Sequence, residues 1–459
     1  MEKERLSNRS IIVMICALAW PTMIEQALQT IVQYADAAMV GSIGPHASAA
    51  VGLTSTMTWL TNAPMFAMGI GVLACISRAM GAGDKEYAHT AAVQAVYIAV
   101  VLGIVEGILM VGVSPFLPSW LGADEEIHRE ATIYFAIISL PMLFRTANVI
   151  FASVLRSTRD MKTPMLVNLV VNGLNIVLNF LLIYGSRTVT LGGLSIPLWG
   201  AGLGVAGAAI ATAVSQSVGG VLMFMAFRNC PALSIKGNGY KLDRVVMGQC
   251  VRIGFPVALE RIFTSLGQVV FTSLVTRLGT ISLAAHSIAL TAEQAFYIPG
   301  FGMQAAASTL AGNAVGEKNE EKLDRVSKWC IIMAVGVMTI TGGLLFLFPQ
   351  AMMSIFTRDA AVIAKGTEAL RIVALSEPMF AVVIILKGIF NGAGDTKTPF
   401  VVSISTMWGI RILFTFISVT ILGLGLNSVW ICMVADNVTQ GIWMGIRFLK
   451  GDWKKRVGF

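Results

Sequence analysis

The chain has 459 residues, of which 56% are hydrophobic and 13% charged, and this composition, with a mean hydropathy of +0.75, excludes an ordinary soluble domain. The net charge of +8 comes from basic residues scattered over several short loops and the C-terminal tail, which is typical of membrane topology and not of nucleic-acid binding. The six cysteines have no ligand-like spacing, so neither a metal cluster nor a disulfide framework is expected.

Apolar stretches long enough to cross a membrane occur twelve times, since a spanning helix needs about 20 mostly apolar residues. The sequence therefore predicts an all-α polytopic membrane protein with spans at residues 11–40, 46–77, 90–115, 128–154, 164–184, 200–227, 246–276, 282–310, 326–350, 362–390, 399–422 and 428–448. Lys and Arg gather in the N-terminus, the tail and every second loop, which predicts that both termini are cytoplasmic.

The first predicted span carries a polar stripe in an otherwise apolar helix, which is expected to kink at Pro21. Glu25, Gln29, Gln33 and Asp36 fall at positions i, i+4, i+8 and i+11, which places them on one helical face. A charged side chain near the bilayer centre costs about 3 kcal/mol, so two acids here indicate a functional, ion-coupling site. The alternative is a stripe that only hydrogen-bonds this helix to a neighbour.

The fifth predicted span carries four asparagines on one face. Asn168, Asn172, Asn175 and Asn179 occupy positions i, i+4, i+7 and i+11 of this helix. Such a row is costly in a membrane unless the amides meet water, each other or an acid. We interpret it as a polar wall opposite the stripe of the first span, where it supplies donors and carbonyls to a bound ion. Contact between helices is the alternative, and both interpretations can hold.

The two halves of the chain repeat at a fixed distance. Pro21 and Glu25 recur as Pro256 and Glu260, 235 residues later, and the turn DMKTP that begins at Asp160 recurs at the same distance as DTKTP. The repeat predicts two six-helix bundles related by a pseudo-twofold axis along the membrane normal. The expected organisation is an N-lobe at residues 1–227, a cytoplasmic linker at 228–244, and a C-lobe at 245–459 with a basic cytoplasmic tail.

The repeated stripe in the C-lobe is chemically different. Glu260 and Gln268 stand at the positions of Glu25 and Gln33, but Phe271 stands at the position of Asp36. The lobes are therefore unequal, and the N-lobe is the expected coupling site.

Other polar side chains within the predicted C-lobe spans are secondary candidates for ion coupling: His286, Glu293, Glu377, Arg411 and Asp436. His286 and Glu293 share a helical face, so they fit either a proton relay or a structural pair. For Arg411, Asp436 and, in the N-lobe, Arg145, we expect buried ion pairing first and substrate contact second.

Several ordered motifs resemble the multidrug and toxic compound extrusion (MATE) family over nearly the whole chain. They are the acid in QYADAAMVGSIG, the openings AAVGL and AAHSI of two helices, and the turn GDTKTP. The resemblance implies an antiporter that expels organic, often cationic, compounds in exchange for protons or sodium ions. It also implies that Asp36 is the ion-coupling carboxylate and that Asn175 lies beside it. Asn179 departs from the pattern, because many relatives have an aspartate there, and Glu377 does not align with the acid that some sodium-coupled relatives use.

Together these observations predict an ion-coupled multidrug exporter of the inner (cytoplasmic) membrane that works by rocking of two lobes. The expected substrates are small, lipophilic and cationic organic compounds, and the expected surroundings are membrane lipid, with no nucleic acid and the protein a monomer. No cofactor is expected. A single matched acid favours H+ as the coupling ion, whereas Na+ at Asp36 or Glu260 is the alternative.

Two other functions are less favoured. A lipid-linked oligosaccharide flippase of the same wider superfamily needs a strongly cationic cavity, but the membrane spans contain few basic residues: Arg145, Arg261, Lys387 and Arg411. A membrane enzyme or an ATP-driven pump would carry a nucleotide, nucleophile or metal motif, and the sequence has none.

Overall fold

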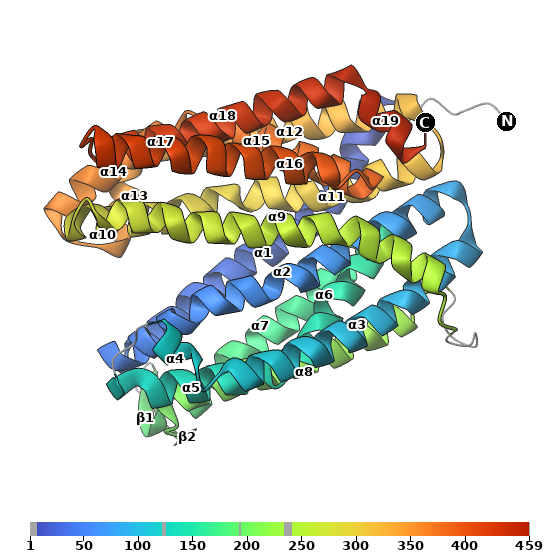
Figure 1. Cartoon of the computed structure of the whole chain (residues 1–459). Coiled ribbons are helices and arrows are strands. Elements are labelled where there is room, and N and C mark those ends of the chain that lie inside the picture. Colours follow the sequence, from blue (N-terminus) through green and yellow to red (C-terminus); the bar gives the residue numbers. More distant parts are fainter. Residues whose placement is uncertain (1–6, 122–124, 192–193, 234–240, 459) are drawn as a thin grey trace.

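The computed structural model describes residues 7–121, 125–191, 194–233 and 241–458, and it is almost entirely helical (Figure 1). The first six predicted spans form the N-lobe, whose helices are α1 (Asn8–Gly41), α2 (Pro45–Ala82), α3 (Lys85–Val113), α4 (Leu117–Trp120), α5 (Glu125–Ser139), α6 (Met142–Ser157), α7 (Lys162–Leu182) and α8 (Gly204–Arg228). Part of the predicted linker, residues 234–240, lies outside the described residues.

The C-lobe contains the other six predicted spans. Its helices are α9 (Arg244–Thr276), α10 (Thr280–Gln294), η1 (Ala295–Tyr297), α11 (Ile298–Gly316), α12 (Glu320–Leu347), α13 (Pro349–Phe356), α14 (Ala360–Ala374), α15 (Glu377–Ala393), α16 (Lys397–Thr406), η2 (Met407–Ile412), α17 (Leu413–Phe416), η3 (Ile417–Ile421), α18 (Leu426–Lys450) and α19 (Asp452–Val457). The all-α, two-lobe architecture predicted from the sequence is confirmed.

Two of the predicted spans are bent helix pairs. The pair α5 and α6 bends by 49°, and the pair α14 and α15 bends by 58°. A proline follows each break, Pro141 directly before α6 and Pro378 in the first turn of α15, and a proline cannot donate the backbone hydrogen bond that would continue the helix. By contrast, α1 remains one helix through Pro21.

Among the described residues, seven helices are individually long and apolar enough to cross a membrane, and nine spans result if each bent pair counts as one. The three remaining predicted spans, α9, α10 with α11, and α18, contain more polar residues but lie among the other helices of the C-lobe (Figure 1).

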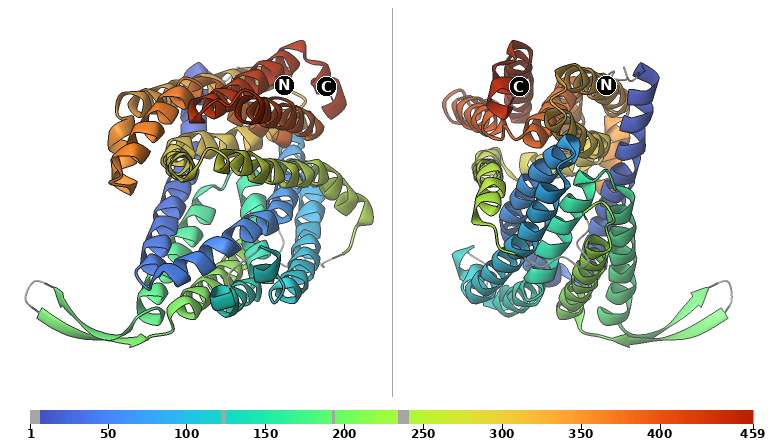
Figure 2. Two further views of the ribbon diagram at one scale, coloured as in Figure 1. Left: turned by 60° about the vertical axis from the view of Figure 1, so that its left-hand side comes forward. Right: turned by 90° about the vertical axis from the view of Figure 1, so that its right-hand side faces the viewer.

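A β-hairpin that the sequence analysis did not predict connects α7 to α8. Strands β1 (Gly185–Leu191) and β2 (Leu194–Ala201) are antiparallel, with Val189 opposite Ile196. The hairpin projects from the helical body in both views of Figure 2. Its β-branched run from Thr188 to Thr190 favours a strand, but the run is short and lies between two strongly apolar spans.

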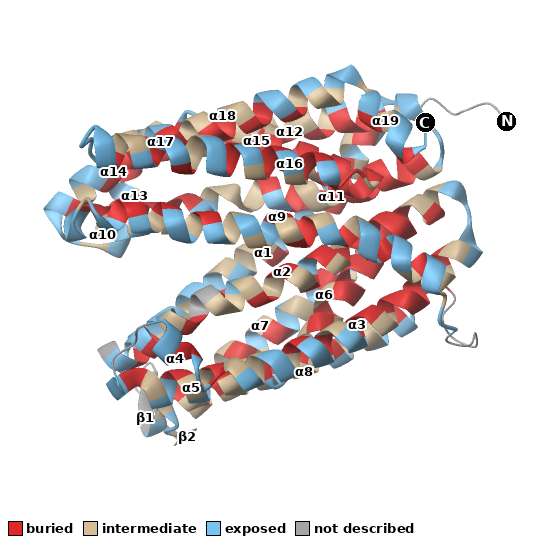
Figure 3. Ribbon diagram, viewed as in Figure 1, coloured by how far each residue is buried: buried red, intermediate tan, exposed pale blue. Residues whose placement is uncertain are grey.

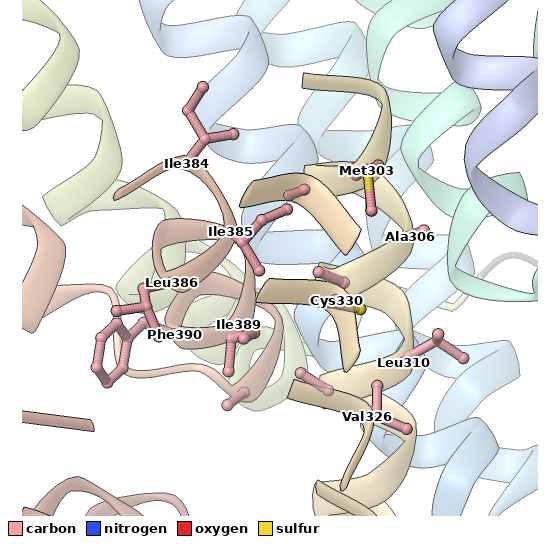
Figure 4. Close-up of a cluster of buried hydrophobic side chains, with 14 of the residues drawn as sticks. Met303, Ala306, Leu310, Val326, Cys330, Ile384, Ile385, Leu386, Ile389 and Phe390 are labelled. Atoms are coloured by element: carbon pink, nitrogen blue, oxygen red, sulfur yellow. The ribbon is translucent and has the colours of Figure 1, made fainter. Parts of the chain in front are cut away.

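Buried residues lie mainly on the inward faces of the helices in each lobe, and exposed residues lie on the outward faces (Figure 3). Most of the buried residues are apolar. In the C-lobe, α11, α12 and α15 enclose a cluster that includes Met303, Leu310, Cys330, Ile385 and Ile389 (Figure 4). Cys330 is fully buried there among apolar side chains, so it packs as a small hydrophobic residue.

The two lobes are packed together at one end of the molecule. A Cβ at Gly81 or Gly312 would overlap the opposite helix, so α2 and α11 approach closely there. Asn313 of α11 donates to the Ser77 carbonyl (3.1 Å) and accepts from Arg159 Nε (2.8 Å). Each of these bonds joins the two lobes.

The same end carries both chain termini. Near the start of α12, Arg325 donates to Asn8 at the start of α1 (2.8 Å), and Asp324 accepts from Lys454 of α19 (2.7 Å). From this end the helices of the two lobes diverge toward the end that carries α10, α13 and the hairpin (Figure 1).

Candidate functional site

Asp36 lies half-buried on α1 and is held by amides of α7. Asn179 Nδ2 donates to Asp36 Oδ1 at 2.6 Å. Turning the Asn175 amide over places its nitrogen 2.9 Å from the same oxygen and lets its carbonyl accept from the Thr212 hydroxyl of α8 (3.3 Å). The carboxylate therefore lies among neutral polar groups from α7 and α8.

The asparagine row of α7 faces both acids of the α1 stripe. Asn168 Nδ2 donates to Glu25 Oε1 at 2.7 Å. This contact lies at the opposite end of the asparagine row from the contact between Asn179 and Asp36. The spacing of the two rows explains this pairing, because both present one polar face along parallel stretches of helix. Two asparagines of the row thus contact the two acids of the stripe, whereas the role of the row toward a bound ion stays a prediction. Asn172 is half-buried in the middle of the row, and Gln33 is exposed.

Glu25 is an ion-paired residue. Its two carboxylate oxygens lie 2.7 and 2.9 Å from Arg156 Nη2 of α6. Glu25 is 8% exposed, so the guanidinium and the Asn168 amide replace the water that its carboxylate has lost. Thr309 of α11 donates to the Arg156 carbonyl (3.1 Å), which places the pair beside the C-lobe. The sequence analysis named no partner for Glu25.

The C-lobe stripe repeats this ion pair with different residues. Glu260 is buried on α9, and its Oε1 lies 2.9 Å from Lys387 Nζ of α15. Gln268 is half-buried farther along α9, and Phe271, at the position that corresponds to Asp36, is fully buried. The two lobes therefore share the paired acid, whereas the amide-held acid belongs to the N-lobe.

A second polar cluster of the C-lobe joins η2 to α18. Arg411 Nε lies 2.8 Å from Asp436 Oδ2, and Arg411 Nη2 donates to Asn437 Oδ1 at 3.2 Å. Buried ion pairing was expected for both residues without a named partner, and they pair with each other. Glu293 and Glu377 are also buried in the C-lobe, each 1% exposed, and Glu293 accepts a hydrogen bond from Tyr297.

His286 lies in an aromatic environment. Its ring is fully buried, with centroids 5.5 Å from Phe271 and 5.6 Å from Trp430. Neither ring nitrogen has a hydrogen-bond partner among the described residues. No hydrogen bond in this part of the structure therefore joins His286 to Glu293, and the geometry favours a packing role for His286 over both expected alternatives, a proton relay and a structural pair.

Arg145 of α6, the third residue for which buried ion pairing was expected, interacts electrostatically with buried Glu106 of α3.

Sequence reasoning missed the role of four residues: Arg156, Lys387, Asn168 as a Glu25 ligand, and Thr212. Only Asn168 gave a signal, its place in the asparagine row. The others contact residues far away in the chain, so their spacing carried no information.

The Asp36 site offers oxygen atoms to a cation. Among the described residues, no group of three or more His, Cys, Asp and Glu side chains is placed to hold a metal ion. A sodium ion would instead use carboxylate, amide and hydroxyl oxygens, the ligands that hard cations prefer. Among the described residues, Asn179 Oδ1 is buried without a hydrogen-bond partner, and the same amide contacts Asp36 and Asn175 through its nitrogen.

The chain is similar to known proteins over nearly its whole length. The curated "Probable multidrug resistance protein NorM" of Thermotoga maritima is 28% identical over 441 residues, which cover 96% of this chain and 92% of that protein. The "Uncharacterized transporter YisQ" of Bacillus subtilis is 23% identical over 443 residues, 96% of this chain and 94% of that protein.

Solved structures are similar along the full length. One is described as the "Outward-facing conformation of a multidrug resistance MATE family transporter of the MOP superfamily"; its TM-score is 0.88, with 26% identity and coverage of 98% of this chain and 97% of that one. A transporter from Pyrococcus furiosus, whose description refers to the "Reverse polarity of binding pocket", has a TM-score of 0.87 at 26% identity, covering 97% of this chain and 96% of that one.

The family model of MatE matches residues 21–181 and 256–417, one match in each lobe. The matches begin at Pro21 and Pro256, the two prolines that mark the repeat. Together they cover most of the chain, and the chain therefore belongs to the MatE family of multidrug efflux (MATE) transporters.

Proposed function

We propose that this protein exports small organic compounds across the inner membrane in exchange for protons, and that both its termini lie in the cytoplasm. The observation that carries the proposal is the state of Asp36. The acids Glu25, Glu260 and Asp436 each have a cationic partner within 4 Å, whereas Asp36 has only neutral partners among the described residues. Asp36 is also half-buried, so an ion can reach it.

Neutral amides suit an acid that gains and loses a proton. An ionised Asp36 accepts charge-assisted hydrogen bonds from Asn179 and, with its amide turned over, from Asn175. Protonation removes the charge and weakens both bonds, so it changes the attachment of α1 to α7. The proton thereby biases the position of α1, which also packs against α11 of the other lobe through the bond from Thr22 to the Gly302 carbonyl (2.8 Å).

The arrangement of the lobes fits a rocking mechanism in an outward-facing state. The bonds of Asn313 and Arg159 close the end that carries the termini, and the helices diverge at the opposite end (Figure 1). With cytoplasmic termini, the diverging end is the outer one. The similarity to a structure described as outward-facing supports this interpretation. Inward opening then requires these interlobe bonds to break.

Charge pairing argues against the flippase alternative. Lys387 and Arg411 are neutralised by Glu260 and Asp436, so they are not free to hold a pyrophosphate group. The intramembrane cations left for such a role are few.

Efflux from proteoliposomes tests the proposal. The purified protein is reconstituted with ethidium, and either a pH gradient or a sodium gradient is imposed alone. We expect efflux under the pH gradient in sodium-free buffer. Efflux under neither gradient, from protein that binds the dye, would contradict ion-coupled export.

A further inference from the structure

The C-terminal helix α19 is fixed to the C-lobe by packing and by charge. Trp453 is 1% exposed, and its ring centroid lies 5.0 Å from that of Phe390 on α15. Lys454 Nζ lies 2.9 Å from Glu320 Oε1 and 2.7 Å from Asp324 Oδ1, both on α12. Six residues are too few for a stable isolated helix, so these contacts hold α19 in place.

An arginine of the N-lobe reaches this helix. Arg78, close to the C-terminal end of α2, donates from Nη2 to the Val457 carbonyl at the end of α19 (3.1 Å). The other nitrogen of its guanidinium, Nη1, lies against the turn between α15 and α16, since a Cβ at Gly394 would be 3.1 Å from it. The Arg78 guanidinium therefore contacts two segments of the C-lobe.

The Val457 carbonyl depends on this donor from the other lobe. Val457 is 4% exposed, and the last carbonyls of a helix have no hydrogen-bond partner within that helix. A buried carbonyl without a partner is costly, whereas a bond from a guanidinium is charge-assisted. Because the donor and the acceptor belong to different lobes, the bond lasts only while the lobes stay together.

The contact lies at the closed end of the molecule, where the two lobes are packed together and both termini lie (Figure 1). Ser77, the neighbour of Arg78, accepts from Asn313 of α11, and a Cβ at Gly316 would overlap the Arg78 carbonyl. Opening of this end moves α2 away from the C-lobe and breaks the bond to Val457. The bond of Asn313 joins two long helices directly, whereas that of Arg78 passes through a short helix that can detach without unfolding a membrane span.

We propose that α19 is a latch on the closed end: the C-lobe carries it, Arg78 of the N-lobe engages it, and its release favours opening toward the cytoplasm. This inference rests on the proposed rocking of the two lobes with cytoplasmic termini. The latch acts on the ratio of outward-open to inward-open protein. It does so through its own contact and not through the Asp36 site.

The thiol of Cys75 reports the opening of this end. Cys75 lies on α2 three residues before Arg78 and is 5% exposed, so N-ethylmaleimide reaches it when the lobes separate there. Its alkylation in the purified protein is followed over time by mass spectrometry of peptides. Cys330 is fully buried inside the C-lobe, and its alkylation in the same sample reports unfolding.

Two variants of the full chain release the latch from opposite sides. Arg78→Gln removes the guanidinium and should raise the rate of Cys75 alkylation about tenfold, the effect of one hydrogen bond from a charged group on an equilibrium. Lys454→Glu places an anion beside the two acids of α12 and should also raise this rate. The double variant should be no faster than the faster single variant, because both changes act on one contact.

Two further variants serve as controls. Arg228→Gln is the matched control, because Arg228 is an exposed arginine of the N-lobe and the last residue of α8. It should keep the wild-type rate of Cys75 alkylation. Arg78→Lys keeps the charge and a donor without the guanidinium, so its rate should lie between those of the wild type and Arg78→Gln.

Opening and transport are measured separately. A wild-type rate of Cys75 alkylation in Arg78→Gln or Lys454→Glu would overturn the latch, as would Cys330 reacting in parallel, which indicates unfolding. Efflux of ethidium from proteoliposomes is measured for the same proteins. If Cys75 responds as expected but the wild type exports no dye under any gradient, the latch stands and the export function fails. If the wild type exports dye and the Cys75 rates do not change, the latch fails and the export function stands.

Discussion

Asn179 of α7 donates a 2.6 Å hydrogen bond to Asp36 of α1, at the position where the family resemblance leads one to expect a second acid. Instead of two carboxylates, the site therefore contains one carboxylate, Asp36, and one amide that donates a hydrogen bond to it. An acid in this setting has a single charge to gain or lose, and its hydrogen bond connects that charge to the contact between two helices.

Replacing Asp36 by asparagine should remove coupling without unfolding the protein. The amide has nearly the shape of the carboxyl group, so packing against α7 is retained, but it does not titrate. We expect Asp36→Asn to elute as a monodisperse protein with a wild-type melting temperature. Efflux driven by a pH gradient should fall to the level of empty liposomes. Wild-type efflux by a well-folded Asp36→Asn protein would contradict the role of Asp36.

Glu25→Gln should behave in the opposite way and destabilise the fold. The change leaves the Arg156 guanidinium without its carboxylate, and breaking a buried ion pair by removing one partner costs about 3 kcal/mol or more. The melting temperature in detergent should therefore fall clearly below that of Asp36→Asn. The double variant Glu25→Gln/Arg156→Gln removes both charges and should recover part of the loss. A single variant as stable as the wild type would show that the ion pair contributes little.

The architecture and one helix contact were predictable from the sequence. Hydropathy gave the twelve spans, and the 235-residue repeat gave the two lobes. The contact of α1 with α7 followed from two polar rows, because polar faces in a membrane must meet each other or water. In each case a regular pattern along the chain carried the information.

Features that depend on single distant contacts were not predictable. Arg156 and Lys387 neutralise Glu25 and Glu260, yet they come from other helices and belong to no periodic pattern. The bends before Pro141 and Pro378 had a local signal, but hydropathy windows average across such breaks. A proline does not always end a helix, because α1 continues without interruption through Pro21.

A natural pair of thiols offers a test of rocking. Cys75 of α2 and Cys250 of α9 are buried at the closed end, where the two helices approach so closely that a Cβ at Gly71 would overlap the Cys250 carbonyl. Copper phenanthroline with oxygen as the oxidant should remove the two thiol protons and two electrons to form a disulfide. This bond would hold the closed end shut, so transport should stop and dithiothreitol should restore it.

Cys75→Ser is the control for this experiment, because it keeps the size of the side chain and removes one thiol. The variant should transport with or without the oxidant. Mass spectrometry of peptides confirms the linkage in the wild type. Full transport by a protein that is shown to be cross-linked would contradict separation of α2 from α9 during the cycle.

The choice of coupling ion depends on the residue beside Asp36, and Asn179→Asp should change it. Sodium binds best to several oxygen ligands with more than one negative charge, and the wild-type site provides one carboxylate together with amide and hydroxyl oxygens. We therefore expect the wild type to export ethidium under a pH gradient in sodium-free buffer. In Asn179→Asp two carboxylates lie within hydrogen-bonding distance, and a sodium ion relieves their repulsion. Export by this variant should respond to a sodium gradient imposed alone.

Glu260→Gln separates this prediction from a coupling site in the C-lobe. Glu260 is held by Lys387, so its loss should lower stability and leave the choice of ion unchanged, and Asp36→Asn should reduce proton-driven export far more. Wild-type export that requires sodium and falls equally in Glu260→Gln would instead move the ion to the C-lobe. If export by Asn179→Asp does not respond to a sodium gradient, a second negative charge beside Asp36 is not enough to select the ion. The oxygens of Asn175 and Thr212 would then be too few to complete the coordination shell of sodium.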